Sequence, residues 1–214
     1  MHYCGGATLK GCDELLNHLT AVELTFRADS QLKDIAFLIA RARGDFETAL
    51  ETTLAGLHAV VFDSMRDVME IEFLLRDFVD NPGHMNEWLT VSDRKRREKF
   101  DPAMLRKRFA ERQGSKPEDM IEAKDYKAHS QYLHVTPYSN PFGSPGFVDD
   151  SHPGILGAYF WELLEHGRRL IFVIFRLQNN IETFQALSEQ NGPNLPLFHD
   201  AWERSRIRYA MWNP

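Results

Sequence analysis

Apolar residues recur at three- and four-residue steps along most of the chain, a spacing that places side chains on one face of an α-helix. The clearest run covers residues 46–79 and a second covers residues 155–190. The first seam consists of Leu50, Leu54, Leu57, Val61, Ser64, Val68, Ile71, Leu75 and Phe78. We find no alternation typical of β-strands. The pattern therefore predicts an all-α bundle built around two long central helices.

Shorter helices are predicted around these two, at residues 13–43, 93–100, 102–112, 118–135 and 196–212. We expect the first to be interrupted at Asp29-Ser30 and to stop at Gly44-Asp45. Asp101 is typical of an N-cap, since Pro102 follows at the first helical position. Four prolines within residues 136–154 predict a long irregular loop, and such loops are usually functional. The chain, residues 1–214, is interpreted as a single helical domain.

Composition places the chain among ordinary globular proteins, with 214 residues, 43% apolar and 26% charged. Two cysteines are too few for a disulfide scaffold or a four-cysteine zinc site. No apolar run reaches the about 18 residues of a membrane span, and no signal peptide is apparent. We therefore expect a cytoplasmic protein that does not bind a membrane.

One segment is strongly basic. Residues 93–112 carry nine basic and four acidic side chains, a net charge of +5 within a chain of net charge −6. A nucleic-acid backbone could bind there, through Arg94, Arg96, Arg97, Arg106 and Arg108. The alternative is a solvated helix face neutralised by its own acids, because only Phe100 and Phe109 are available for base stacking.

Two sets of polar residues share helical faces. Arg66 and Glu70 lie four positions apart within an apolar helix, so this arginine could bind phosphate or carboxylate beside an acid–base glutamate. The alternative is a structural ion pair. Tyr126, Ser130 and His134 form a second stripe, in which His134 could act as a base. Alternatively, Ser130 bonds to the backbone and His134 caps the helix end.

The histidines show no spacing typical of a metal site. There are nine, and none forms His-x-x-x-His or His-Glu-x-x-His. His129 and His134 are five apart and do not share a face. The Glu-x-x-His pair of di-iron bundles is also absent. We therefore expect no metal and no cofactor.

The Arg66-x-x-x-Glu70 and Tyr126-x-x-x-Ser130-x-x-x-His134 patterns, with a proline-rich loop before another long helix, support a resemblance. Over about residues 45–190 the chain resembles an uncharacterised bacterial family of helical proteins, which is distantly similar to HEPN domains. HEPN domains are helical bundles that often act as ribonucleases or nucleotide-binding modules in toxin and defence systems. Their catalytic Arg-x4–6-His spacing is missing; the nearest match is Lys124-x4-His129, and lysine lacks the planar fork of arginine.

Three hypotheses follow. The first is a HEPN-like binding or regulatory module, in which Arg66, Glu70, Tyr126, Ser130 and His134 form a polar cluster between helices near the 136–154 loop. The second is a metal-independent ribonuclease acting on RNA. In it, His134 or His129 is the base, Arg66 or Lys124 stabilises phosphate charge, and the basic segment holds RNA. The third is a homodimer that uses the long seams. RNA or a nucleotide and a second copy are thus the expected partners.

Overall fold

The computed structural model describes residues 6–133, 153–179 and 195–212, and this part of the chain is helical without β-strands. The all-α bundle predicted from the sequence is confirmed. Its helices are α1 (Gly6–Ala28), α2 (Ala36–Leu54), α3 (His58–Asp80), α4 (Pro82–Thr90), α5 (Asp93–Phe100), α6 (Pro102–Gln113), α7 (Ile121–Leu133), α8 (Pro153–Asn179) and α10 (Pro196–Trp212). Short 3-10 turns lie at Lys33–Ile35 and Pro117–Asp119.

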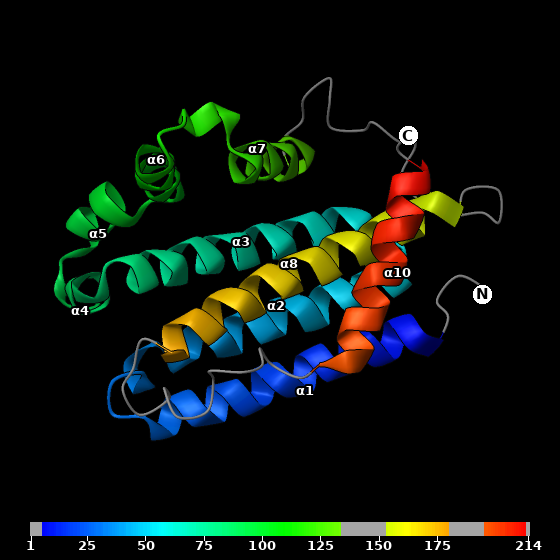
Figure 1. Cartoon of the computed structure of the whole chain (residues 1–214), viewed down its shortest axis with the longest axis horizontal. Coiled ribbons are helices and arrows are strands. Elements are labelled where there is room, and N and C mark those ends of the chain that lie inside the picture. Colours follow the sequence, from blue (N-terminus) through cyan, green and yellow to red (C-terminus); the bar gives the residue numbers. More distant parts are fainter. Residues whose placement is uncertain (1–5, 134–152, 180–194, 213–214) are drawn as a thin grey trace.

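The long helices α1, α2, α3 and α8 lie side by side, and α10 crosses α1 and α8 (Figure 1). Their apolar seams meet in one core, whose fully buried members include Leu19, Ile39, Met65 and Leu170. None of the described helices is long and apolar enough to cross a membrane. Burial of these seams against one another supplies the main driving force for the fold.

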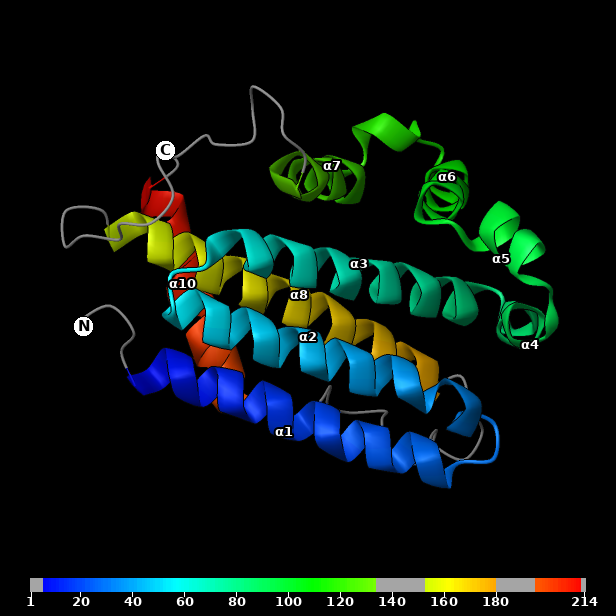
Figure 2. The ribbon, with the colours of Figure 1, turned by 180° about the vertical axis from the view of Figure 1, so that it is seen from behind.

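Helices α4, α5, α6 and α7 form an arm that runs back along α3, on the side away from α1 (Figures 1 and 2). The arm is anchored by aromatic contacts, and the ring of Phe109 on α6 lies 6.2 Å from that of Phe73 on α3. The cap predicted at Asp101 is confirmed, because its side chain accepts the Ala103 N–H at 2.8 Å. Gly114 ends α6 in the left-handed conformation, at φ 65°.

The first central helix begins later than the sequence pattern predicts. Helix α2 continues through Gly44-Asp45, and the chain reverses at Ala55–Leu57 instead. Gly56 there adopts φ +76°, which favours glycine, whereas Gly44 is accommodated within the helix. The predicted helix 46–79 is thus divided between α2 and α3. Leu57 is 57% exposed because it lies at the turn between them.

The other boundaries agree better with the sequence. The break at Asp29 is confirmed: its carboxylate accepts the N–H groups of Gln31 and Leu32 at 2.7 and 3.1 Å. Helix α10 covers the predicted residues 196–212. Helix α8 begins at Pro153 and is described to Asn179, so the predicted continuation to residue 190 lies outside the described residues. Residues 136–152 of the predicted 136–154 loop also lie outside them, and its last two residues begin α8.

Glycine permits a close helix crossing at Gly167 on α8. A Cβ atom at this position would lie 2.8 Å from Leu15 Cδ2 of α1 and 3.3 Å from the Phe198 ring of α10. The three helices therefore approach each other where α8 has no side chain.

Candidate metal centre

Three of the five residues in the predicted polar cluster lie together between α3 and α7. The Tyr126 hydroxyl donates to Glu70 Oε1 at 2.8 Å, and Arg66 Nε lies 3.7 Å from the same oxygen. Burial and this bond raise the pKa of Tyr126 to about 12. Ser130 is half-buried on the same helix, and His134 lies outside the described residues. The cluster links the arm to the bundle.

The other predicted ligand-binding residues, Lys124 and His129, point in different directions from α7. Lys124 is exposed. His129 is buried, with 2% of its surface exposed. Since the two side chains do not share an environment, His129 is the one that belongs to an internal site.

That internal site combines two acid–histidine pairs from different helices. Asp125 and His129 are four apart on α7, and Glu162 and His166 are four apart on α8, so each pair shares one face of its helix. The two faces meet beside α3. One potential ligand atom from each of the four side chains lies within 4.8 Å of the other three. We call this group the metal centre.

The separations within the metal centre match those around a tetrahedral metal ion. Bonds of about 2.0–2.2 Å at the tetrahedral angle place neighbouring ligand atoms about 3.3–3.6 Å apart. His129 Nε2 lies 3.4 Å from His166 Nε2, 3.2 Å from Glu162 Oε2 and 3.5 Å from Asp125 Oδ1. His166 Nε2 lies 3.4 Å from Glu162 Oε2 and 4.0 Å from Asp125 Oδ2. Three of the four ligand atoms thus have tetrahedral spacing, and the Asp125 carboxylate would have to move for one of its oxygens to reach the same spacing.

Neighbouring groups orient two of the ligands. His129 Nδ1 lies 3.3 Å from the Phe62 carbonyl oxygen, which can only accept a hydrogen bond. The proton of a neutral His129 therefore resides on Nδ1, and the Nε2 lone pair faces the centre. Arg169 binds Asp125 Oδ2 at 2.7 Å and also binds Glu165 at 3.1 Å. Such outer contacts are typical of metal sites, where they fix ring orientation and carboxylate position.

Interactions between the carboxylates and the imidazoles of this group shift their pKa values strongly. Burial by itself lowers the pKa of His129. Hydrogen bonds to Asp125 and Glu162, together with the negative charges of these two carboxylates, outweigh burial and raise the pKa of His129 to about 9. Burial by itself raises the pKa of Glu162. Hydrogen bonds from His129 and His166 outweigh burial and lower the pKa of Glu162 to about 2. The pKa of Asp125 is likewise held below its usual range, against burial, chiefly by His129. His129 is thus protonated at neutral pH when no metal is bound, and a divalent ion would have to replace that proton to bind two carboxylates and two neutral imidazoles.

The spacing of two histidines on one helix does not indicate this group, because α7 and α8 each supply only one of its histidines. The usable signal is the repeated acid-x-x-x-His spacing, Asp125 to His129 and Glu162 to His166. Each pair alone is common on helices. Only the packing of α7 against the bundle brings the two pairs together.

The predicted nucleic-acid residues divide into internal and surface side chains. Arg108 binds buried Asp77 through Nε at 3.1 Å and Nη2 at 3.0 Å. Arg96 donates to the carbonyls of Trp88 and Val91, and Arg106 lies 4.2 Å from the centroid of the Tyr126 ring. These three hold the arm together.

Arg94 and Arg97 are exposed. Arg94 forms an ion pair with Glu98 at 3.1 Å on its own helix. Of the five arginines predicted to contact a nucleic-acid backbone, two are exposed. RNA binding stays a prediction, as does the ribonuclease hypothesis.

Comparison of the chain with family models, with curated proteins and with solved structures finds no match. The HEPN resemblance therefore stays a prediction, as does the homodimer.

Proposed function

We propose that this protein binds one divalent transition-metal ion between α7 and α8, with Asp125, His129, Glu162 and His166 as ligands. The proposal rests on one observation: His129 Nε2, His166 Nε2 and Glu162 Oε2 lie 3.2–3.4 Å from one another, as ligands of a tetrahedral ion do, and a carboxylate oxygen of Asp125 lies within 4.8 Å of all three.

Zinc is the metal that these ligands favour. Imidazole nitrogen suits Zn²⁺, Cu²⁺, Fe²⁺ and Ni²⁺, whereas Mg²⁺ and Ca²⁺ prefer oxygen ligands and higher coordination numbers. Zn²⁺ accepts both imidazole and carboxylate and is usually tetrahedral when protein side chains supply all four ligands. Four protein ligands leave no open position in such a shell, which favours a structural or regulatory ion over a catalytic one.

The ion would fasten the arm to the bundle. Helix α7 packs along α3, and the metal centre connects it to α8 through side chains. The Tyr126–Glu70 hydrogen bond makes a second connection next to Asp125. A bound ion would therefore also hold Tyr126 against Glu70, which agrees with the binding or regulatory module expected from the sequence.

Metal titration of the full-length protein tests the proposal. The protein is stripped with a chelator, then titrated with Zn²⁺ against a chromophoric competitor. We expect one ion per chain, and a tetrahedral absorption spectrum when Co²⁺ replaces Zn²⁺. The Glu162→Gln variant keeps the shape of the side chain, and we expect its affinity to fall by more than the about 10–100-fold typical of an outer-shell change.

His199→Ala is the matched control, since His199 is an exposed histidine on α10. Its affinity for Zn²⁺ should equal that of the wild type. Circular dichroism of each variant checks that the helices are intact. A folded wild-type protein that binds no Zn²⁺, or Glu162→Gln binding as tightly as the wild type, would contradict the proposal.

A further inference from the structure

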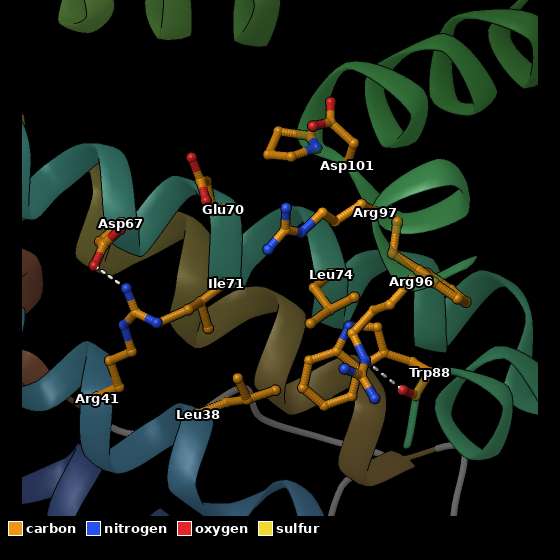
Figure 3. Close-up of a pocket in the computed structure, with 12 residues that line it drawn as sticks. Leu38, Arg41, Asp67, Glu70, Ile71, Leu74, Trp88, Arg96, Arg97 and Asp101 are labelled. Atoms are coloured by element: carbon orange, nitrogen blue, oxygen red, sulfur yellow. Dashed lines mark hydrogen bonds and ion pairs between the residues drawn. The ribbon is translucent and has the colours of Figure 1, made fainter. Parts of the chain in front are cut away.

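A groove of about 270 Å³ lies between α2 and α3 on one side and the arm on the other (Figure 3). It contains none of the four metal ligands. Its walls are mainly apolar, formed by Leu38, Ile71, Leu74, Trp88, Phe100 and Pro102. An apolar concavity with a few charged groups at its edge is the usual form of a small-molecule site.

The acidic side chains that line the groove already have partners. Asp67 forms an ion pair with Arg41. Glu70 accepts the hydrogen bond of Tyr126 at 2.8 Å, and Asp101 accepts the N–H of Ala103 at 2.8 Å. Their negative charges are thus partly compensated within the protein.

Arg97 has no such compensation. Figure 3 shows its guanidinium group reaching from α5 across the groove, between Glu70 and Leu74. No residue in the described part of the chain forms an ion pair with it. Its neighbour Arg96 differs, because it is bonded to Asp93 and to the Trp88 carbonyl. The groove therefore offers one uncommitted guanidinium above an apolar floor.

We propose that this groove binds a small monocarboxylate with an apolar body. The carboxylate would bind the planar fork of Arg97, which can donate two parallel hydrogen bonds. The apolar body would lie against Trp88 and Leu74. A phosphate monoester fits less well, because it carries about two negative charges and would face three acidic side chains with only one uncommitted cation.

The size of the groove restricts the ligand. Pockets for drug-sized molecules measure about 300–1,000 Å³, and this groove lies just below that range at about 270 Å³. A medium-chain fatty acid or an arylacetate is of suitable size, and octanoate is a practical probe.

The test uses the full-length, metal-loaded protein and isothermal titration with octanoate, octanol and octyl phosphate. We expect octanoate to bind best of the three. The Arg97→Gln variant should weaken octanoate binding by about 10- to 100-fold, the range for losing a hydrogen-bonded charge. Its binding of octanol should not change. The indole N–H signal of Trp88, assigned with Trp88→Phe, should shift when octanoate is added.

Arg94→Gln is the matched control, on the same helix with a side chain 88% exposed. It should bind octanoate like the wild type. The absence of octanoate binding at millimolar concentration, equal losses in the two arginine variants, or tighter binding of octyl phosphate would each overturn the proposal. Arg97→Gln leaves all four proposed metal ligands in place and should bind Zn²⁺ like the wild type, so failure of the metal centre and failure of the groove are distinguishable.

Discussion

His129 of α7 and His166 of α8 direct their Nε2 atoms at each other across 3.4 Å, although they are 37 positions apart in the chain. Both imidazoles are buried, 2% and 1% exposed, and two carboxylates flank them. Two facing nitrogen acceptors repel each other unless a proton or a cation lies between them. The raised pKa of His129 keeps such a proton there when no metal is bound, and the proposed ion would replace it and contact both nitrogens and both carboxylates.

Removing the metal should loosen α7 more than the rest of the bundle. The proposed ion would link α7 to α8, whereas the contact between α1 and α2 consists mainly of apolar packing. We expect chelation to increase hydrogen exchange of the α7 amides, with little change in α1. Saturating Zn²⁺ at about 100 times its dissociation constant should add about 2.7 kcal/mol to the free energy of unfolding. The same gain in Glu162→Gln would show that the stabilisation comes from another site.

The arm should depend on a buried ionic cluster around Asp77. This side chain is fully buried and binds Arg108 through two bonds of 3.0–3.1 Å, and His84 Nδ1 lies 2.7 Å away. Asp77→Asn leaves the Arg108 charge without its partner, and we expect a loss of about 3–5 kcal/mol in the free energy of unfolding by urea. Asp93→Asn, at an acid 84% exposed, should change it by less than about 1 kcal/mol. Similar losses in both variants would argue against a structural role for the cluster.

Two glycines should respond to alanine in opposite directions. A Cβ atom at Gly11 of α1 would lie 2.9 Å from the Leu197 carbonyl oxygen and 3.2 Å from Phe198 Cα, both backbone atoms of α10. Gly11→Ala should therefore destabilise the protein by about 1–3 kcal/mol, because one helix must move. A Cβ atom at Gly44, inside α2, would meet nothing within 4 Å. Gly44→Ala should stabilise by about 0.5–1 kcal/mol through helix propensity.

Thermal and urea unfolding of the two single variants measure this difference. If Gly11→Ala is as stable as the wild type, the crossing of α1 and α10 is looser than the structure shows.

Asp45 should make the protein less stable as the pH rises. It is half-buried, and burial together with the charges of Asp67 and Asp63 raises its pKa to about 6, against the opposing charge of Arg41. The unfolded value is about 3.9, so the folded state binds more protons between about pH 4 and pH 6. The stabilisation that protonated Asp45 gives the folded state is therefore lost as the pH rises from about 4 to about 6.

Asp45→Asn removes that titration. We expect the variant to be about 1 kcal/mol more stable than the wild type at pH 7, after allowing for solvent screening. At pH 4 the two proteins should differ little. Urea unfolding at both values measures the difference, and an equal gain at pH 4 and pH 7 would point to a cause other than the charge of Asp45.

Local sequence features predicted several elements closely. Helix α6 begins at the expected cap, because the Asp101 side chain and the fixed φ of Pro102 act within a few residues. Helix α10 covers residues 196–212 for a similar reason: a proline begins it and its apolar spacing continues to the end. The turn at Gly56 was missed, because glycine is compatible with both a helix and a left-handed turn, and the helical pattern on both sides is equally good.

The metal centre depended on information that no local pattern contains. The sequence determines that Asp125 shares a helix face with His129, and Glu162 with His166, since four residues make about one helical turn. It determines equally that Arg66 and Glu70 are neighbours.

Only the tertiary structure decided that Asp125 and His129 of α7 reach Glu162 and His166 of α8. It also decided that Arg108 binds Asp77 while Arg97 lines a groove. Spacing in the sequence determines which side chains share one face of a helix. Which faces of two helices contact each other depends on the burial of apolar surface over the whole core. Residues far apart in the chain therefore meet at one site only when the bundle folds.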